Sequence, residues 1–261
     1  MHLLLTDETN LNATTQARFF VYGGLFIDTE SLPALTARIN TIRKTAGYKP
    51  ADEFKFDTRS RPPQVTVQGA KEAKRETISA CQETGCQFIA SLVLHDIAKK
   101  KSQAALIEWG MNTVISQFHQ YLAQRDTHGI VTVDRLTNHS EYQLLAKRFT
   151  TGLELQKATT LRLERVHLFS ATCNNASHAS SALDIVLGAF RYCINDTRGT
   201  AAAKEMMNTV VPLLWHERDG DNILALERGL VFRPKAVRVP AYQKAYDDLL
   251  DHINTLLKGT P

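Results

Sequence analysis

Four acidic residues have the types and positions that could support metal-dependent chemistry. Asp7 ends the apolar run HLLLTD, and Asp134 ends the β-branched segment HGIVTVD. Asp184 lies within the otherwise apolar stretch SSALDIVLGAF, and Glu53 lies within the charged segment DEFKF. A hard divalent cation such as Mg²⁺ is held in proteins by a few carboxylates and by substrate phosphate. The four acids therefore form a candidate metal site if folding gathers them in one place.

Each acid also has an ordinary structural explanation. Strand ends meet solvated loops, where Asp7 or Asp134 would simply face water. Asp184 could serve the dipole of its helix, with Gly188 as a packing contact, and Glu53 could be a solvated loop charge. Only the arrangement of the surrounding strands and helices favours a metal site over these alternatives.

The segments that carry Asp7 and Asp134 favour their convergence. Residues 2–7 and 18–27 predict two antiparallel strands joined by a polar loop. The segment 128–134 lies between two predicted helices, which favours a parallel position reached by a helical crossover. Sites in open α/β sheets form outside the carboxyl ends of the strands. If the first segment and the third lie side by side and parallel, the two carboxylates come close together, and a cation relieves their repulsion.

Asp184 and Glu53 each have basic neighbours that could contact phosphate. At helical spacing, Asp184, Gly188 and Arg191 share one face, and the glycine lets a ligand or the sheet approach closely. Lys55 lies two residues after Glu53, so both side chains point the same way if the segment is extended. Lys55 and Arg191 are candidate substrate ligands. Further phosphate contacts are expected from the other basic residues of 38–75, which are Arg38, Arg43, Lys44, Lys49, Arg59, Arg61, Lys71, Lys74 and Arg75.

The rest of the pattern predicts an α/β fold. Two further strands are expected at 86–96 and 162–169, and residues 48–67 are expected to be irregular because of their prolines and charges. Helices are expected at 32–46, 68–84, 102–125, 140–149, 180–195, 201–214 and 241–257. We expect residues 1–198 to form one domain and residues 199–261 to form a C-terminal helical extension packed on the same domain.

The four acidic elements, taken in order, resemble a known family. TDET with Asp7, EFK with Glu53, VTVD with Asp134 and LDIVLGA with Asp184 resemble the family catalogued as domain of unknown function 3800, over roughly residues 3–195. Its members look RNase H-like. The resemblance implies a mixed sheet, made of an antiparallel hairpin plus parallel strands and flanked by helices. Ser181 stands where that family usually has Gln, and Thr9 replaces its Ser.

The resemblance also implies a two-metal site. RNase H-like nucleases hold two divalent ions, here Mg²⁺ or Mn²⁺, and the ligands would be Asp7, Glu53, Asp134 and Asp184. By hypothesis Asp7 bridges both ions, Asp134 and Asp184 complete one each, and Glu53 orients or deprotonates the attacking water. Glu8 should point to the opposite face of its strand and is interpreted as structural.

Three histidines are weaker candidates. His139 and His178 lie near Asp134 and Asp184 in sequence and could carry a proton. His95 ends a predicted strand beside Asp96, where it could join a metal site or be an ordinary strand-end residue.

The leading hypothesis is a divalent-metal-dependent nuclease or related phosphoryl-transfer enzyme that acts on nucleic acid, RNA or DNA. The alternatives are a non-catalytic nucleic-acid- or partner-binding protein of RNase H-like fold, and a small-molecule hydrolase. A binder of polyanions gains nothing from four converging negative charges, so the acids favour the enzyme. The chain has no G-x-S-x-G turn and no G-x-x-x-x-G-K-[ST] phosphate loop.

Composition is consistent with a globular, cytoplasmic protein. Hydrophobic residues make up 43% of the chain, and 31 basic and 27 acidic residues give a formal charge of +4. That charge is too mild to require a nucleic-acid partner but permits one. No membrane span or signal peptide is expected. The 4 cysteines are expected to be reduced thiols. The oligomeric state stays open.

Overall fold

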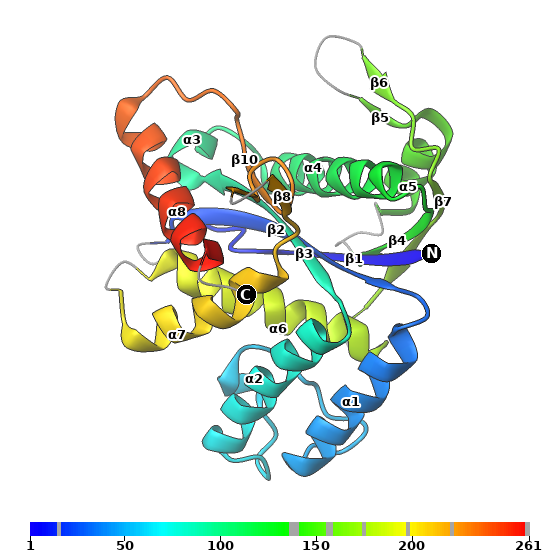
Figure 1. Ribbon diagram of the computed structural model, residues 1–261, viewed down its shortest axis with the longest axis vertical. Helices are drawn as coiled ribbons and strands as arrows, with labels where there is room; N and C mark the ends of the chain where they lie inside the picture. Colours follow the sequence, from blue (N-terminus) through cyan, green and yellow to red (C-terminus); the bar gives the residue numbers. More distant parts are fainter. Residues whose placement is uncertain are drawn as a thin grey trace.

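A six-stranded mixed sheet forms the centre of the computed structural model, with helices on both faces (Figure 1). The structure describes residues 1–14, 17–135, 141–154, 159–173, 176–196, 199–219 and 222–258. The strand order in the sheet is β10-β3-β2-β1-β4-β7. These strands are β1 (His2–Thr9), β2 (Phe19–Asp28), β3 (Gln87–Leu94), β4 (Gly129–Asp134), β7 (Val166–Thr172) and β10 (Leu230–Phe232).

The strand directions confirm the expected fold class, an α/β protein whose mixed sheet combines an antiparallel hairpin with parallel strands. β1 pairs with β2 and β2 pairs with β3 in antiparallel fashion, whereas β4 is parallel to β1 and β7 is parallel to β4. The carboxyl ends of β1, β4 and β7 therefore meet at one edge of the sheet. Side chains that follow these three strands are brought to the same place.

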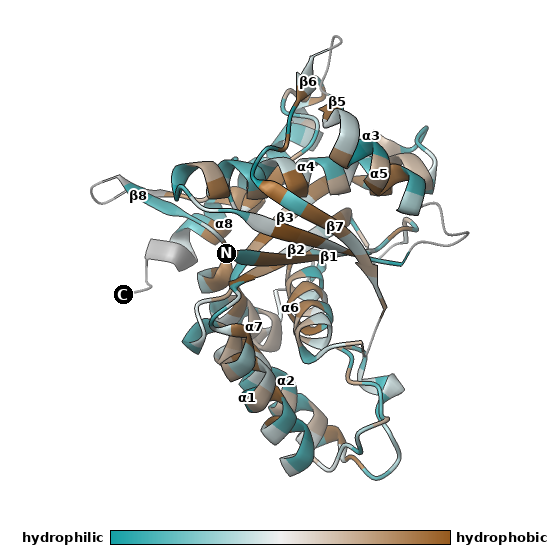
Figure 2. Cartoon of the chain, turned by 90° about the vertical axis from the view of Figure 1, so that its right-hand side faces the viewer, coloured by the Kyte–Doolittle hydropathy of each residue, from teal (hydrophilic) through white to brown (hydrophobic). Residues whose placement is uncertain are grey.

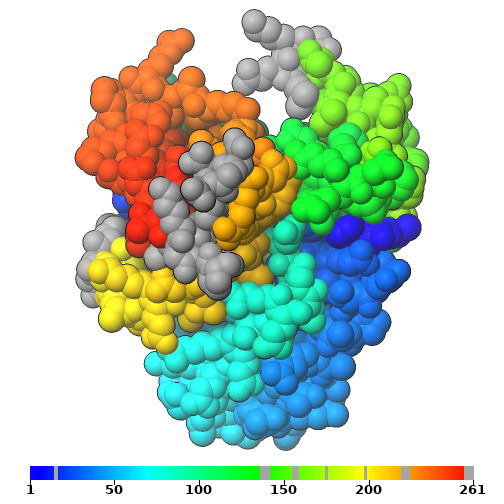
Figure 3. Space-filling model, in the orientation of Figure 1, coloured from blue at the N-terminus to red at the C-terminus, as the bar shows by residue number. Residues whose placement is uncertain are grey.

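Helices cover the two faces of the sheet unequally (Figures 1 and 2). α6 (His178–Asn195) lies directly on β1 and β2. The helices packed against α6 are α1 (Leu32–Thr45), α2 (Val67–Glu83) and α7 (Ala201–Val210). The opposite face carries α4 (Gln103–Gln124), with α5 (Glu141–Thr151) beside β7. In the space-filling view, the segment of α1 and α2 forms the lower part of the molecule, coloured blue to cyan (Figure 3).

Alternation along the strands separates two apolar cores. Leu5 of β1 belongs to the core beneath α6, whereas Leu4 belongs to the core beneath α4. In β4, Val131 and Val133 face the α4 core. Since successive side chains of a strand point to opposite faces, Asp7 and Asp134 both project toward the α6 face.

The C-terminal part of the chain returns to the sheet. β10 runs parallel to β3, with Leu230 opposite Ala90. α8 (Pro240–Lys258) closes this side through Tyr246, whose hydroxyl accepts from Leu94 N at 2.8 Å and donates to the Arg233 carbonyl at 2.9 Å. None of the described helices has both the length and the apolar character that crossing a membrane requires.

Several element boundaries differ from those expected. The strand expected at 86–96 ends at Leu94, and α3 (His95–Ala98) follows as one helical turn. The strand expected at 162–169 begins at Val166 and extends to Thr172. The helix expected at 201–214 ends at Val210, and a 3-10 turn with a proline in its first turn, Val211–Leu213, follows.

Short elements complete the description. β5 (Leu153–Glu154) pairs with β6 (Thr160–Leu161), and β8 (Glu217–Asp219) pairs with β9 (Asn222–Leu224). None of these short strands was expected, and neither was β10. A strand of two or three residues is too short to show a hydrophobic period.

Candidate metal centre

Asp7 and Asp134 lie on neighbouring parallel strands at matching positions. The register pairs Thr6 with Val133, so the next residue on each strand is one of the two acids. Burial, followed by the charges of Asp134, Glu8 and Asp184, raises the pKa of Asp7 to about 8. The Glu8 amide, which donates to Asp7 Oδ1 at 2.7 Å, acts in the opposite direction. The convergence expected from the strand ends is therefore present.

Asp184 reaches the same cluster from α6. Burial raises the pKa of Asp184, whereas an amide hydrogen bond and the charges of Lys55, Arg191 and Lys74 lower it. Burial likewise raises the pKa of Asp134, and the charge of Asp184 adds to this effect. The three aspartates thus lie within electrostatic reach of one another in a partly desolvated place.

The start of α6 explains why Asp184 is held firmly. Ser177 caps the helix, and its hydroxyl accepts from Ser180 N at 3.0 Å. The Ser180 hydroxyl in turn accepts from Ser177 N, which completes a capping box. The helix is apolar over most of its surface because it packs on the sheet and on three other helices. Asp184 therefore lies one and a half turns into a well-anchored helix, rather than in its first turn as the dipole explanation required.

The segment 48–66, called the docked loop below, covers Asp184. The amide of Phe56 donates to Asp184 Oδ2 at 2.6 Å. The ring of Phe56 lies against Gly188, where an added Cβ would clash with it. The glycine identified in the sequence therefore does permit close approach, and the group that approaches is this loop.

Glu53 is connected to the aspartates through Lys55. The Lys55 ammonium lies 3.0 Å from Glu53 Oε2, and the Glu53 side chain is 52% exposed. The charge of Lys55 lowers the pKa of both Asp134 and Asp184, so Lys55 lies near that pair as well as beside Glu53. Glu53 therefore lies at the rim, and the three aspartates form the centre.

Buried aromatic and basic groups hold the first half of the docked loop. Phe54 is buried and its ring lies 4.9 Å from that of Tyr48. The guanidinium of Arg43, itself 5% exposed, lies over both rings and donates to the Asp52 carbonyl at 2.7 Å. This anchoring fixes the backbone on the amino-terminal side of Lys55.

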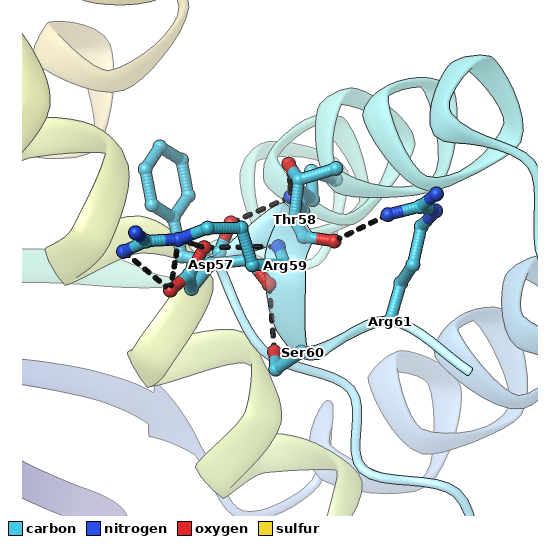
Figure 4. A network of polar contacts seen from close by, with 7 residues as sticks. Asp57, Thr58, Arg59, Ser60 and Arg61 are labelled. Atoms are coloured by element: carbon cyan, nitrogen blue, oxygen red, sulfur yellow. Dashed lines mark hydrogen bonds and ion pairs between the residues drawn. The ribbon is translucent and has the colours of Figure 1, made fainter. Parts of the chain in front are cut away.

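A 3-10 turn, Thr58–Ser60, lies in the second half of the docked loop (Figure 4). The Asp57 carboxylate accepts from Arg59 N at 3.0 Å, and the Ser60 hydroxyl donates to the Asp57 carbonyl at 2.6 Å. Arg61 donates to the Thr58 carbonyl at 3.1 Å. The turn is held by hydrogen bonds among its own and adjacent residues.

Many of the basic residues expected to bind phosphate have structural partners. Arg38, Arg59 and Arg75 pair with Glu83, Asp57 and Glu205, and Arg43 and Lys74 are buried. Exposed lysines of this segment are Lys44, Lys49 and Lys71. Arg191 lies close enough to Asp184 to lower its pKa. The basic surface near the acids is thus smaller than the sequence suggests.

Two residues near the site have roles that were not expected. Burial, followed by the charge of Asp134, raises the pKa of Glu8 to about 7, although strand alternation places Glu8 on the other face. Its adjacency to Asp7 at a strand end was the available signal. Lys74 is 4% exposed and contacts the docked loop. No sequence signal separates it from the surface lysines of the same helix.

Of the candidate histidines, the two in the described part of the chain show no arrangement specific to catalysis. Burial lowers the pKa of His178 at the start of α6, and the charge of Arg43 lowers it further. Burial also lowers the pKa of His95 in α3. His139 lies outside the described residues.

The donor set of the cluster suits a hard divalent ion, because it consists of carboxylate oxygens whose mutual repulsion a cation would relieve. In the described ranges, no group of three or more His, Cys, Asp or Glu side chains is assembled closely enough to hold a metal ion. The structure therefore shows a cluster of acidic charge, and bound metal is a matter for proposal.

Comparison with known proteins gives little further information. No protein-family model matches the sequence, and no curated protein matches it. Among solved structures, the chain is similar to a mutant of Bst-RNase HIII, with 15% sequence identity and a TM-score of 0.40. The alignment covers 82% of this chain and 56% of that one, so the chain spans about half the length of that protein.

Proposed function

We propose that this protein is a divalent-metal-dependent nuclease that hydrolyses phosphodiester bonds in RNA or DNA, and that it belongs to the family catalogued as domain of unknown function 3800. Residues 1–198 would carry the site, with residues 199–261 as an extension packed on the same domain. The ions would be Mg²⁺ or Mn²⁺, two in number.

One observation supports the proposal most strongly. Asp7, Asp134 and Asp184 come from two strand ends and a helix, and each is partly removed from water beside like charges. Such an arrangement destabilises the folded chain unless protons or a cation compensate it. A fold that gathers acids at this cost has a use for the bound cation.

The residues would divide the work as follows. Asp7, whose pKa is raised by the charges of both other aspartates, would contact both ions, and Asp134 and Asp184 would each contact one. Bound divalent ions would supply Lewis-acid stabilisation of the phosphate and a more acidic water. Glu53, exposed at the rim, would orient or accept a proton from the attacking water. Lys55 and Arg191 would bind the phosphate backbone.

The alternative is a non-catalytic protein of the same fold that binds nucleic acid or a protein partner. The exposed position of Glu53 fits this alternative better than it fits the enzyme. The pairing or burial of many basic residues in 38–75 fits a protein partner better than a nucleic acid, because fewer of them are free to contact phosphate. The buried aspartates fit it worse, because negative charge repels a polyanion. A small-molecule hydrolase with the same cluster remains a third candidate.

A cleavage assay tests the proposal. Purified protein would be incubated with Mg²⁺ or Mn²⁺ and labelled single-stranded, double-stranded and hybrid RNA and DNA. We expect cleavage that chelator abolishes and that Asp7→Asn or Asp134→Asn reduces by about 100-fold or more, as for loss of a catalytic group. Asp28→Asn is the matched control, because Asp28 ends β2 at the opposite edge of the sheet. Full activity in both cluster variants would overturn the mechanism, and binding without cleavage would favour the alternative.

A further inference from the structure

Phe56 is held by a buried charge from each of two helices. Its amide donates to Asp184 Oδ2 of α6 at 2.6 Å, and its carbonyl accepts from Lys74 Nζ of α2 at 2.5 Å. Lys74 also donates to Thr58 Oγ1 at 2.6 Å, and its ammonium lies 5.3 Å from the centre of the Phe56 ring. Both polar groups of one residue are thus bound by side chains of opposite charge.

Burial makes these contacts expensive to lose. The Lys74 side chain is 4% exposed, and burial lowers the pKa of its ammonium while nearby Asp57 and Asp184 raise it. A buried ammonium is tolerated only where oxygen acceptors surround it. The two oxygen atoms that accept hydrogen bonds from Lys74 are the Phe56 carbonyl and the Thr58 hydroxyl, both in the docked loop, so an undocked loop would leave Lys74 without them.

Lys55 precedes Phe56 directly, so the position of its backbone depends on these contacts. Phe54, on the other side, is buried against Tyr48 and Arg43. With both neighbours anchored, Lys55 can project only toward the remaining side, where it meets Glu53 and lies near Asp134 and Asp184. The loop therefore presents one cation to a cluster of acids.

We propose that Lys74 is a positioning residue that, by gripping Phe56 together with Asp184, holds Lys55 in the acidic cluster as a built-in counter-charge. This inference rests on the proposed function for its biological purpose. The hydrogen bonds of Lys74 and Asp184 to Phe56, called the grip below, do not depend on metal or activity. Lys55 and an incoming divalent ion compete for the same carboxylates, since like charges repel at short range. Lys74 thereby sets how readily the site accepts a metal ion.

Two measurements on the intact chain test the grip without metal. We expect Lys74→Met to speed hydrogen–deuterium exchange in residues 53–58 and to increase the acetylation of Lys55 by an amine-reactive ester at least about threefold. Lys74→Arg, which keeps a buried donor, should restore most of the protection. Lys71→Met is the matched control on the same helix, because Lys71 is exposed, and it should change neither measurement.

The outcomes separate the grip from the proposed function. Unchanged exchange and unchanged Lys55 labelling in Lys74→Met would overturn the grip. If that variant does not fold, Thr58→Val removes one partner of Lys74 and should raise the rate of hydrogen exchange and the Lys55 labelling to a smaller extent. No change in either measurement would also overturn the grip. Calorimetric titration with Mn²⁺ then tests competition, with tighter binding expected in Lys55→Met and in Lys74→Met, and no additional gain in the double variant. Absence of Mn²⁺ binding by the wild-type chain contradicts the metal-dependent function, while exchange and labelling still decide the grip.

Discussion

The ring of Phe56 lies against the backbone of Gly188, so closely that residue 188 has no room for a Cβ. Phe56 and Gly188 are 132 positions apart in the chain (188 minus 56), and their contact fixes the docked loop over α6. The relationship explains a glycine in the middle of a helix, where glycine is otherwise unfavourable by about 0.5–1 kcal/mol relative to alanine.

Gly188→Ala should displace the docked loop. We expect a loss of about 1–3 kcal/mol in the free energy of unfolding, as for other overpacked sites, measured by urea denaturation. In a Phe56→Ala background the same substitution should cost much less, because the clashing ring is gone. Equal losses in both backgrounds would contradict the contact.

The stability of the metal-free protein should fall as the pH rises. Folding raises the pKa of Asp7 to about 8 and that of Glu8 to about 7. At pH values between the ordinary pKa of each carboxyl and its raised pKa, the folded state therefore binds more protons than the unfolded state. Stability from this source is fully present below the unfolded pKa values and is lost as the pH rises through 7 to 8. Urea denaturation in chelator at pH 6 and pH 9 measures the loss.

Asp7→Asn should reduce this pH dependence, because the amide does not ionise. Asp251→Asn, at an exposed position of α8, should leave it unchanged. Added Mn²⁺ should also reduce it in the wild-type chain, since the ion replaces protons in compensating the carboxylates. An identical dependence of stability on pH in the wild-type chain, in Asp7→Asn and in the control variant would argue against the acidic cluster.

Two substitutions of Asp184 should behave differently. Asp184→Asn keeps an oxygen that can accept from the Phe56 amide, whereas Asp184→Ala removes it and leaves a buried donor unpaired, at a cost of about 1–3 kcal/mol. We expect both variants to lose metal-dependent cleavage but only the alanine variant to show faster hydrogen exchange in the docked loop. Equal exchange in both would show that the hydrogen bond does not hold the loop.

Binding of nucleic acid should depend on salt. If Lys55, Arg191 and the exposed lysines contact the phosphate backbone, the logarithm of affinity should fall linearly with the logarithm of salt concentration. The triple variant in which Lys44, Lys49 and Lys71 become Gln should show a shallower slope, as measured by fluorescence anisotropy with a catalytically silent Asp7→Asn chain. A slope near zero in the Asp7→Asn chain that keeps all its lysines would show that these residues do not contact the phosphate backbone.

The local pattern of the sequence was sufficient to predict five of the six strands of the sheet and the meeting of Asp7 with Asp134. Strands of β-branched and apolar residues that end in an acid have a strong period and a clear end, and the helical crossover dictates their parallel order. The same pattern could not show what lies over Asp184. Gly188 indicated a close approach, but its partner is a loop residue from a distant part of the chain.

Lys74 and Glu8 show where such prediction fails. Lys74 belongs to a helix with several charged residues and becomes buried only because the docked loop folds over it. Glu8 points away from Asp7 by alternation, yet Asp134 still affects its pKa because charges interact through a partly desolvated strand end over several ångströms. Burial created by tertiary packing, rather than residue type, determines both roles.

The placement of β10 has a consequence for any shortened version of this protein. β3 lies between β2 and β10, and β10 comes late in the sequence, at residues 230–232. A chain cut before Leu230 would keep the four candidate acids of the site. It would expose the hydrogen-bonding edge of β3, which could then pair with a strand of another molecule. We therefore expect such truncations to aggregate.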